Sequence, residues 1–149
     1  AMIKSHVLFT FCALSAAIPT VNAGALEDAV EYRQAAMNVF SWNLGHMAAM
    51  VKGEVPFDRA AFAKNAGDLS KATSLHVLDG FPEDSVSDDS DAKDEIWLDW
   101  QDFEAKYVKM QENVSALNKA AEGGDEAAMT AAFKDAGASC KACHKAYKN

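Results

Sequence analysis

The chain contains 149 residues, of which 50% are hydrophobic, and it carries 14 Lys and Arg against 22 Asp and Glu, a formal net charge of −8. This length suits one domain with a single core, and the small share of glycine and proline favours a mostly helical globule. The acidic balance, which includes no basic patch, argues against nucleic acid and membrane surfaces as partners. Signatures of phosphate-binding loops, serine hydrolases and zinc proteases are also absent from the sequence.

The first 23 residues have the features of a signal peptide. Lys4 gives the segment a positive start, residues 7–18 form an uncharged apolar run, and a small-x-small pattern ends at Ala23. This apolar run is too short to span a bilayer. We therefore expect the protein to be exported, residues 1–23 to be removed, and residues 24–149 to form the mature domain.

Four stretches of the mature chain repeat apolar residues at spacings of three and four, which predicts four helices. The first spans about residues 26–52 and ends at Gly53. Asp58 and Asp125 are candidate N-caps for the second and fourth helices, because aspartate favours this position. The adjacent glycines at 123 and 124 separate the third helix from the fourth. The sequence therefore predicts an all-α fold, an antiparallel four-helix bundle with mainly short loops.

The expected core stripes are defined by this spacing. They comprise Leu26, Val30, Arg33, Met37, Phe40, Leu44, Met47 and Val51 on the first helix; Phe62, Leu69 and His76 on the second; Ile96, Trp100, Phe103, Tyr107, Met110, Val114, Leu117 and Ala121 on the third; and Met129, Phe133, Ala136, Cys140, Cys143 and Tyr147 on the fourth.

A long acidic and serine-rich segment, at about residues 78–94, separates the second helix from the third. Its sequence DSVSDDSDAKDE superficially resembles a calcium-binding loop. It lacks the central glycine and the regular ligand spacing of an EF-hand. We therefore expect a solvated loop.

The fourth helix ends in CKACH, at positions 140–144. Cys140 and Cys143 lie three residues apart and share a helix face, while His144 projects about 100 degrees away. Two thiols at this spacing can add to the two vinyl groups of one haem, and the adjacent imidazole can ligate the iron. A zinc site would need two further ligands, and a thioredoxin-like pair would need an α/β setting. The motif predicts one covalent haem c, with His144 as the metal ligand.

No disulfide framework competes with this interpretation. The third cysteine, Cys12, lies within the apolar run and would leave with the signal peptide, so the mature chain would hold only Cys140 and Cys143.

Arg33 also indicates a haem site, because it occupies a core-stripe position where an unpaired charge would be costly. A haem propionate would suit it, since the planar guanidinium pairs well with a carboxylate. The alternatives are an arginine that reaches out to solvent or one that pairs with Glu27 or Glu31.

Three segments resemble a known family. EDAVEYRQAAM on the first helix, EIW at the start of the third and GASCKACHKAY near the C-terminus are similar to cytochrome c′, a class II c-type cytochrome, over about residues 25–148. The resemblance implies a bacterial periplasmic protein, usually a homodimer, with five-coordinate haem that binds nitric oxide and carbon monoxide. It also implies that Arg33 and Gln34 contact the haem edge and that Asp91 is a further haem-side contact. Lys148 replaces the family's usual arginine and cannot reproduce its planar fork.

The resemblance places Met37 at the distal position of the haem pocket, which leaves two functions open. Methionine on a core stripe is commonly filler, and this favours an open iron site that binds gases. The alternative is an electron carrier in which the Met37 sulfur is the sixth ligand. We do not expect an enzyme, because peroxidase and oxygenase chemistry needs polar distal groups. The stripe neighbours are the apolar residues Val30, Phe40 and Leu44.

A second apolar stripe follows the first helix at four-three-four-three spacing and consists of Ala35, Val39, Trp42, His46 and Ala49. A helix that is apolar on two faces needs two partners. We therefore expect a homodimer that packs through this helix, with Trp42 partly buried in the interface.

Overall fold

The computed structural model describes residues 23–149, so the expected signal peptide, apart from its last residue, and Cys12 lie outside the described range. The helices are α1 (Ala23–Val51), α2 (Arg59–Thr73), a short 3-10 helix η1 (Val77–Gly80), α3 (Glu95–Leu98), α4 (Trp100–Gly123) and α5 (Glu126–Tyr147). Within this range no helix is long and apolar enough to cross a membrane.

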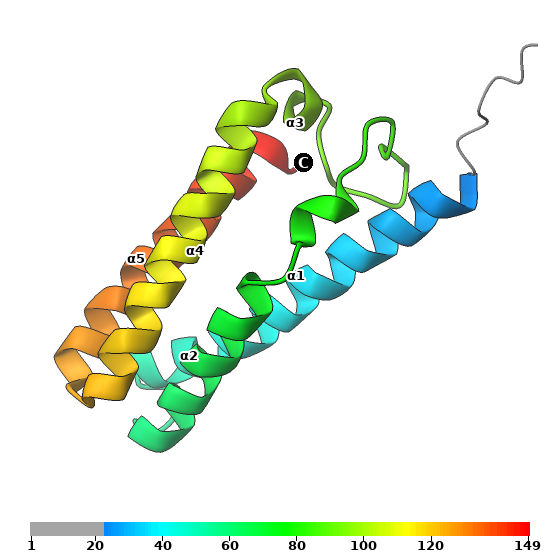
Figure 1. Ribbon diagram of the computed structural model, residues 1–149. Coiled ribbons are helices and arrows are strands. Elements are labelled where there is room, and N and C mark those ends of the chain that lie inside the picture. Colours follow the sequence, from blue (N-terminus) through cyan, green and yellow to red (C-terminus); the bar gives the residue numbers. More distant parts are fainter. Residues whose placement is uncertain (1–22) are drawn as a thin grey trace, which may run out of the picture.

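The four long helices form two antiparallel pairs, α1 with α2 and α4 with α5 (Figure 1). The most extensive contacts are between α4 and α5, between α1 and α2, and between α2 and α4, whereas α1 and α5 touch only slightly. The C-terminus, α3 and the segment that follows η1 gather at one end of the bundle (Figure 1). The expected all-α four-helix bundle is therefore confirmed.

The predicted helix ends are confirmed by the local hydrogen bonds. The side chain of Asp58 accepts a hydrogen bond from Ala61 N at 3.0 Å, and Asp125 accepts one from Ala128 N at 2.7 Å. These bonds satisfy backbone donors that the first turn of a helix leaves free. Gly124 follows α4 with φ 75° and ψ 2°, a left-handed conformation that glycine adopts without a steric cost.

The prediction of the third helix is wrong in one respect, because the structure has two helices, α3 and α4, in its place. Asp99, with φ −134° and ψ 58°, ends α3 and precedes α4, where its side chain accepts a hydrogen bond from Asp102 N at 3.4 Å. Aspartate competes with helical backbone bonds in this way. The break lets α3 turn aside while Ile96 is still buried in the core.

The second helix is shorter than expected. It ends at Thr73, so the predicted core residue His76 lies beyond it, is exposed, and directly precedes η1. Val77 fills the buried position instead. The following segment is also less solvated than predicted, since Phe81 and Ser85 are buried.

The core combines the predicted stripes with a shift on α1. Phe40 and Met47 are buried as expected, whereas Met37, Leu44 and Val51 are only half-buried. The additional buried residues of α1 are Ala36, Asn43 and Met50. The predicted stripes of the last two long helices are buried at Phe103, Tyr107, Met110, Val114, Leu117, Ala121, Met129, Ala136 and Tyr147.

We predict that Gly124→Ala lowers the free energy of unfolding by about 1–2 kcal/mol, because a Cβ in the left-handed region collides with the following carbonyl oxygen. Gly123→Ala is the matched control, since this helical position has no atom within 4 Å of an added Cβ. That variant should keep or slightly raise the stability. Denaturant unfolding measures both, and equal effects would contradict the left-handed cap as the cause.

Candidate functional site

A cavity of about 350 Å³ opens at the end of the bundle where α3 and the C-terminus lie. Its volume falls within the range of about 300–1,000 Å³ that is usual for small-molecule sites. The lining includes every predicted site residue except Cys140 and consists of Arg33, Gln34, Met37, Asn38, Phe81, Ser90, Asp91, Ala92, Ile96, Phe103, Tyr107, Cys143, His144, Tyr147 and Lys148. The slight contact between α1 and α5 explains how both helices can contribute to one cavity.

The last turns of α5 provide the cysteines and the histidine. Cys140 and Cys143 are free and half-buried, and Cys140 packs against the core behind the cavity. Burial raises the pKa of both thiols, and the neighbouring Cys140 further raises the pKa of Cys143. Partial burial and then the charge of Lys148 lower the pKa of His144. The cavity therefore receives a neutral imidazole beside two protonated thiols at neutral pH.

The α1 wall presents Arg33, Gln34 and Met37. Arg33 is only 3% exposed. It donates from Nη1 to Gly80 O at 2.9 Å and to Ser85 Oγ at 2.6 Å, and from Nη2 to Ser85 O at 2.7 Å and to Ser90 Oγ at 2.8 Å. It thus neither reaches out to solvent nor pairs with a glutamate of its own helix.

Gln34, the next residue, contacts the same segment from an exposed position. Its Nε2 donates a hydrogen bond to Asp89 O at 2.6 Å. Met37 is half-buried and packs against the core. Asn38 is a further polar residue of α1 in the lining. The cavity therefore meets one apolar and three polar side chains of α1, of which Arg33 and Gln34 are already hydrogen-bonded to residues 80–90.

The C-terminal tail closes another side of the cavity. Lys148 forms an ion pair with Asp91 at 2.9 Å, and Asn149 N donates to Asp91 O at 2.8 Å. Lys93 N donates to Tyr147 O at 3.1 Å. The end of α5 is thereby joined to residues 91–93, and Asp91 lies at the cavity through its contact with the lysine that replaces the expected arginine.

The apolar lining differs from the one expected around Met37. Val30, Phe40 and Leu44 are not among the residues that line the cavity. The apolar walls come instead from Phe81, Ile96, Phe103 and Tyr107. Burial raises the pKa of Tyr107 to about 12 and keeps its hydroxyl neutral.

A hydrogen-bonded group beside the cavity was missed by the sequence analysis, which treated Tyr147 only as a core residue. The Tyr147 hydroxyl donates to Asp102 Oδ2 at 2.5 Å, and Lys106 Nζ donates to Asp102 Oδ1 at 2.8 Å. The Tyr147 ring meets Phe103 edge-on, with centroids 5.2 Å apart. No spacing in the sequence signals this contact, because Tyr147 and Asp102 belong to different helices.

These residues fit a covalently attached haem. Two free thiols three residues apart can form two thioether bonds, and the neutral imidazole of His144 offers a nitrogen lone pair to iron. The apolar walls would exclude water from a flat aromatic macrocycle. Among the described residues there is no cluster of three histidine, cysteine or acidic side chains that could hold a bare metal ion.

Comparisons with known proteins agree with this site. The family model described as Cytochrome C′ matches residues 28–148. A cytochrome c′ from Alcaligenes xylosoxydans xylosoxydans is 40% identical over 122 residues, which cover 82% of this chain and 94% of that protein. The solved structure of cytochrome c prime from Shewanella frigidimarina has a TM-score of 0.80 at 40% identity and covers 83% of this chain and 96% of that one.

A further solved structure is a nitric oxide complex of a mutant cytochrome c prime from Alcaligenes xylosoxidans. It has a TM-score of 0.76 at 40% identity, and the match covers 83% of this chain and 95% of that one. The similarity thus extends over most of both chains and includes the helices that surround the cavity.

We predict that Tyr147→Phe destabilises the fold, because it removes a donor to Asp102 and keeps the ring. Lys106 and then Tyr147 hold the pKa of Asp102 below its ordinary value of 3.8. A lowered folded-state pKa contributes stability above pH 3.8 that is lost as the pH falls through the folded value. The difference in unfolding free energy between the wild type and this variant should therefore shrink in acid.

Tyr32→Phe is the control for this prediction, since Tyr32 is an exposed tyrosine of α1. Chemical unfolding at pH 7 and at pH 3 measures both variants. A difference for Tyr147→Phe that does not change with pH would contradict a role for the Asp102 carboxylate.

Proposed function

The chain belongs to the cytochrome c′ family, and from this premise we propose that it is a periplasmic haem protein that binds nitric oxide and carbon monoxide at a five-coordinate iron. Family membership implies covalent c-type haem. The observation that carries the proposal is the cavity that Cys143 and His144 share with Met37, a half-buried side chain that packs against the core. The nitric oxide complex of a relative supports the choice of gas.

Each residue has a distinct role in this proposal. Cys140 and Cys143 would hold the haem through thioether bonds, and His144 would offer a nitrogen to its iron. When bound, the haem would supply an iron that can bind a diatomic gas. Phe81, Ile96 and Phe103 keep water from the cavity.

Met37 limits the size of the ligand that can reach the iron. Its unbranched thioether fills irregular space, and its packing against the core supports a covering role. The second candidate is an electron carrier with Met37 as sixth ligand. The specific observation in its favour is that the Met37 side chain lines the cavity shared with His144.

Nitric oxide buffering and electron transfer to an unidentified redox partner are part of the proposal, and enzymatic turnover is not. Catalysis of the peroxidase type needs polar groups that are free to act on a bound ligand. The polar α1 residues in the cavity lining are Arg33, Gln34 and Asn38, and the first two donate hydrogen bonds to residues 80–90.

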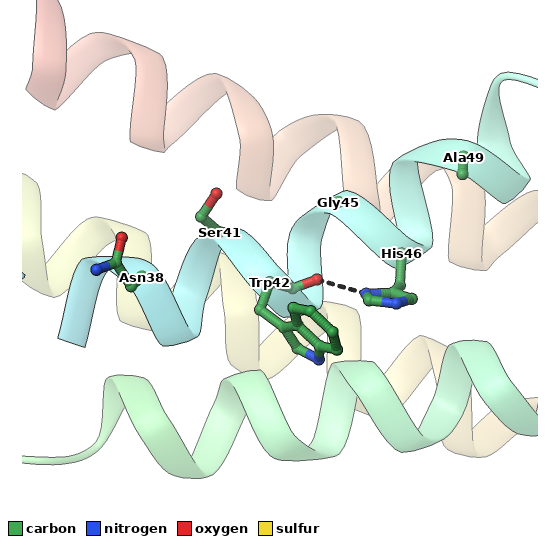
Figure 2. A pocket seen from close by; sticks show the side chains of 6 residues that line it. All are labelled: Asn38, Ser41, Trp42, Gly45, His46 and Ala49. Carbon is green, nitrogen blue, oxygen red and sulfur yellow. Dashed lines mark hydrogen bonds between the residues drawn. The ribbon is translucent and has the colours of Figure 1, made fainter. Parts of the chain in front are cut away.

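We also propose a homodimer through the exposed face of α1. Trp42 is 68% exposed there and lies beside His46, with ring centroids 4.5 Å apart (Figure 2). A shallow groove of about 620 Å³ runs along this face and is lined by Asn38, Ser41, Trp42, Gly45, His46 and Ala49. Of the expected stripe, Trp42, His46 and Ala49 line the groove, whereas Ala35 and Val39 do not. A large exposed aromatic beside a groove is typical of interface anchors.

The haem assignment predicts a specific intact mass. Expression in a bacterial host with working haem-attachment machinery should give a protein that has lost residues 1–23 and gained one haem. Cys140→Ala together with Cys143→Ala should abolish covalent attachment, because each thiol forms one of the two bonds. An unmodified mass for the wild-type polypeptide would contradict the assignment.

The open-site assignment predicts a high-spin ferrous spectrum and binding of both gases. Met37→Ala should bind carbon monoxide faster because apolar bulk has left the cavity. Met37→Leu is the matched control, since it keeps the bulk and removes the sulfur, and it should leave the spin state unchanged. A low-spin wild type that becomes high-spin in both variants would instead establish Met37 as a ligand.

The dimer predicts that Trp42→Ala weakens self-association. Light scattering at micromolar concentration should give a dimeric mass for the wild type and a lower average mass for the variant. Leu98→Ala serves as the control, because Leu98 is 83% exposed at the end of α3, away from the α1 groove. A monomeric wild type at this concentration would exclude the proposed dimer.

A further inference from the structure

The last turns of α5, which carry Cys143 and His144, are supported mainly by one other helix. α5 packs extensively against α4 but touches α1 and α3 only slightly. Cys143 and His144 both line the cavity. The direction in which the His144 imidazole enters the cavity therefore depends mainly on how the end of α5 is joined to α4.

Tyr147 forms a polar link between these two helices. Its hydroxyl donates to Asp102 Oδ2 at 2.5 Å, and Lys106 Nζ donates to Asp102 Oδ1 at 2.8 Å. Both oxygens of the carboxylate are thus occupied, one by a residue of α5 and the other by a residue of α4 itself. Hydrogen bonds to an ionised carboxylate are roughly twice as strong as those between neutral groups.

The proton of this link belongs to the tyrosine. Burial, and then the hydrogen bond to Asp102, raise the pKa of Tyr147 above its ordinary value of 10.0. The hydrogen bond from Lys106, and then that from Tyr147, lower the pKa of Asp102 below its ordinary value of 3.8. At neutral pH Tyr147 is therefore a neutral donor and Asp102 is a charged acceptor.

The ring of Tyr147 belongs to the cavity, whereas its hydroxyl does not depend on what the cavity holds. Tyr147 is 6% exposed and lines the cavity, and its ring meets Phe103 edge-on. Asp102 and Lys106 are not among the lining residues. Their side chains are 43% and 33% exposed, so the hydroxyl binds them at the outer surface of α4. A group bound in the cavity would meet the ring and leave the hydrogen bond in place.

The main chain of Tyr147 is held as well. Its carbonyl oxygen accepts a hydrogen bond from Lys93 N at 3.1 Å. His144 lies three residues before Tyr147, and residues at this spacing are neighbours on a helix surface. A rotation of the last turn about the helix axis would break the bond to Asp102 and would also turn the imidazole of His144. The two positions are thus mechanically coupled.

We propose that Asp102 is a positioning residue for the iron ligand His144, on which it acts through Tyr147. Asp102 lies on a different helix from His144 and outside the cavity lining. The proposal rests on the proposed function for the role of His144 as a ligand to haem iron. The link between Asp102 and Tyr147 is a property of the polypeptide.

The first test measures the iron–histidine stretching band of the ferrous haem-loaded protein by resonance Raman spectroscopy, because the strength of this bond depends on the orientation of the imidazole. The band should shift or broaden in Tyr147→Phe and in Asp102→Ala, since the last turn of α5 can then rotate. Lys109→Gln is the matched control. It removes a lysine of the same helix whose ion pair with Glu112, at 3.2 Å, is exposed, and it should keep the wild-type band.

Two further variants show whether one bond is responsible. The double variant Tyr147→Phe and Asp102→Ala should shift the band no further than Tyr147→Phe alone, because both changes remove the same interaction. Asp102→Asn keeps an oxygen that can accept from the tyrosine hydroxyl. Its band should therefore stay closer to that of the wild type than the band of Asp102→Ala.

A second measurement does not require haem. Hydrogen exchange at the amides of residues 144–149 should be about tenfold faster in Tyr147→Phe than in the wild type, because one charge-assisted hydrogen bond is lost. Tyr32→Phe, which changes an exposed tyrosine of α1, should exchange as the wild type does.

A wild-type Raman band in both Tyr147→Phe and Asp102→Ala would overturn the proposal, even if both variants were less stable, because a purely structural link would lower stability without changing the iron–histidine bond. A wild type without covalent haem, or one with low-spin ferrous iron, would instead refute the proposed function. In that case faster exchange in Tyr147→Phe would still support the link that fixes the His144 turn, and exchange equal to that of Tyr32→Phe would overturn it.

Discussion

The separation of α1 from α5 is the constraint on which the site depends. α2 packs against both α1 and α4, and α4 packs against α5, so the bundle is held together without extensive contact between its first and last helices. Met37 of α1 and His144 of α5 both line the cavity, because side chains do not fill the space between these two helices. A bundle with four equal interfaces would have filled the same volume with core residues.

The segment between α2 and α4 maintains this separation. It binds to α1 on one side of the cavity and to the end of α5 on the other, and it leaves the space between them open. On the α1 side, the Arg33 fork and Gln34 hold residues 80–90. On the α5 side, Lys148 and the backbone of the C-terminal residues hold Asp91 and Lys93. The break at Asp99 contributes as well, because it turns α3 across the end of the bundle, and Ile96 becomes part of the cavity lining.

The sequence predicted those features that depend on neighbours within a few residues. The CKACH motif and the N-caps at Asp58 and Asp125 are local patterns and lie where they were expected, and the helical stripes do so apart from the shift on α1 and the exposed His76. The break at Asp99 could not be predicted from its stripe, since aspartate suits both a helix surface and a cap. The partners of Arg33 are 47 to 57 residues away, so only the fold brings them together.

Lys148 carries the same charge as the arginine expected at this position, but it differs in geometry and therefore in the contacts that it can make. Lysine ends in a compact ammonium on a flexible stem, whereas arginine presents a planar fork that can stack or bind a second group. Here the ammonium is committed to Asp91 at 2.9 Å, and the backbone of Asn149 binds the same aspartate. The Lys148 ammonium is therefore held near His144 by its contact with Asp91. It helps to close the cavity, and its charge adds to partial burial in lowering the pKa of His144.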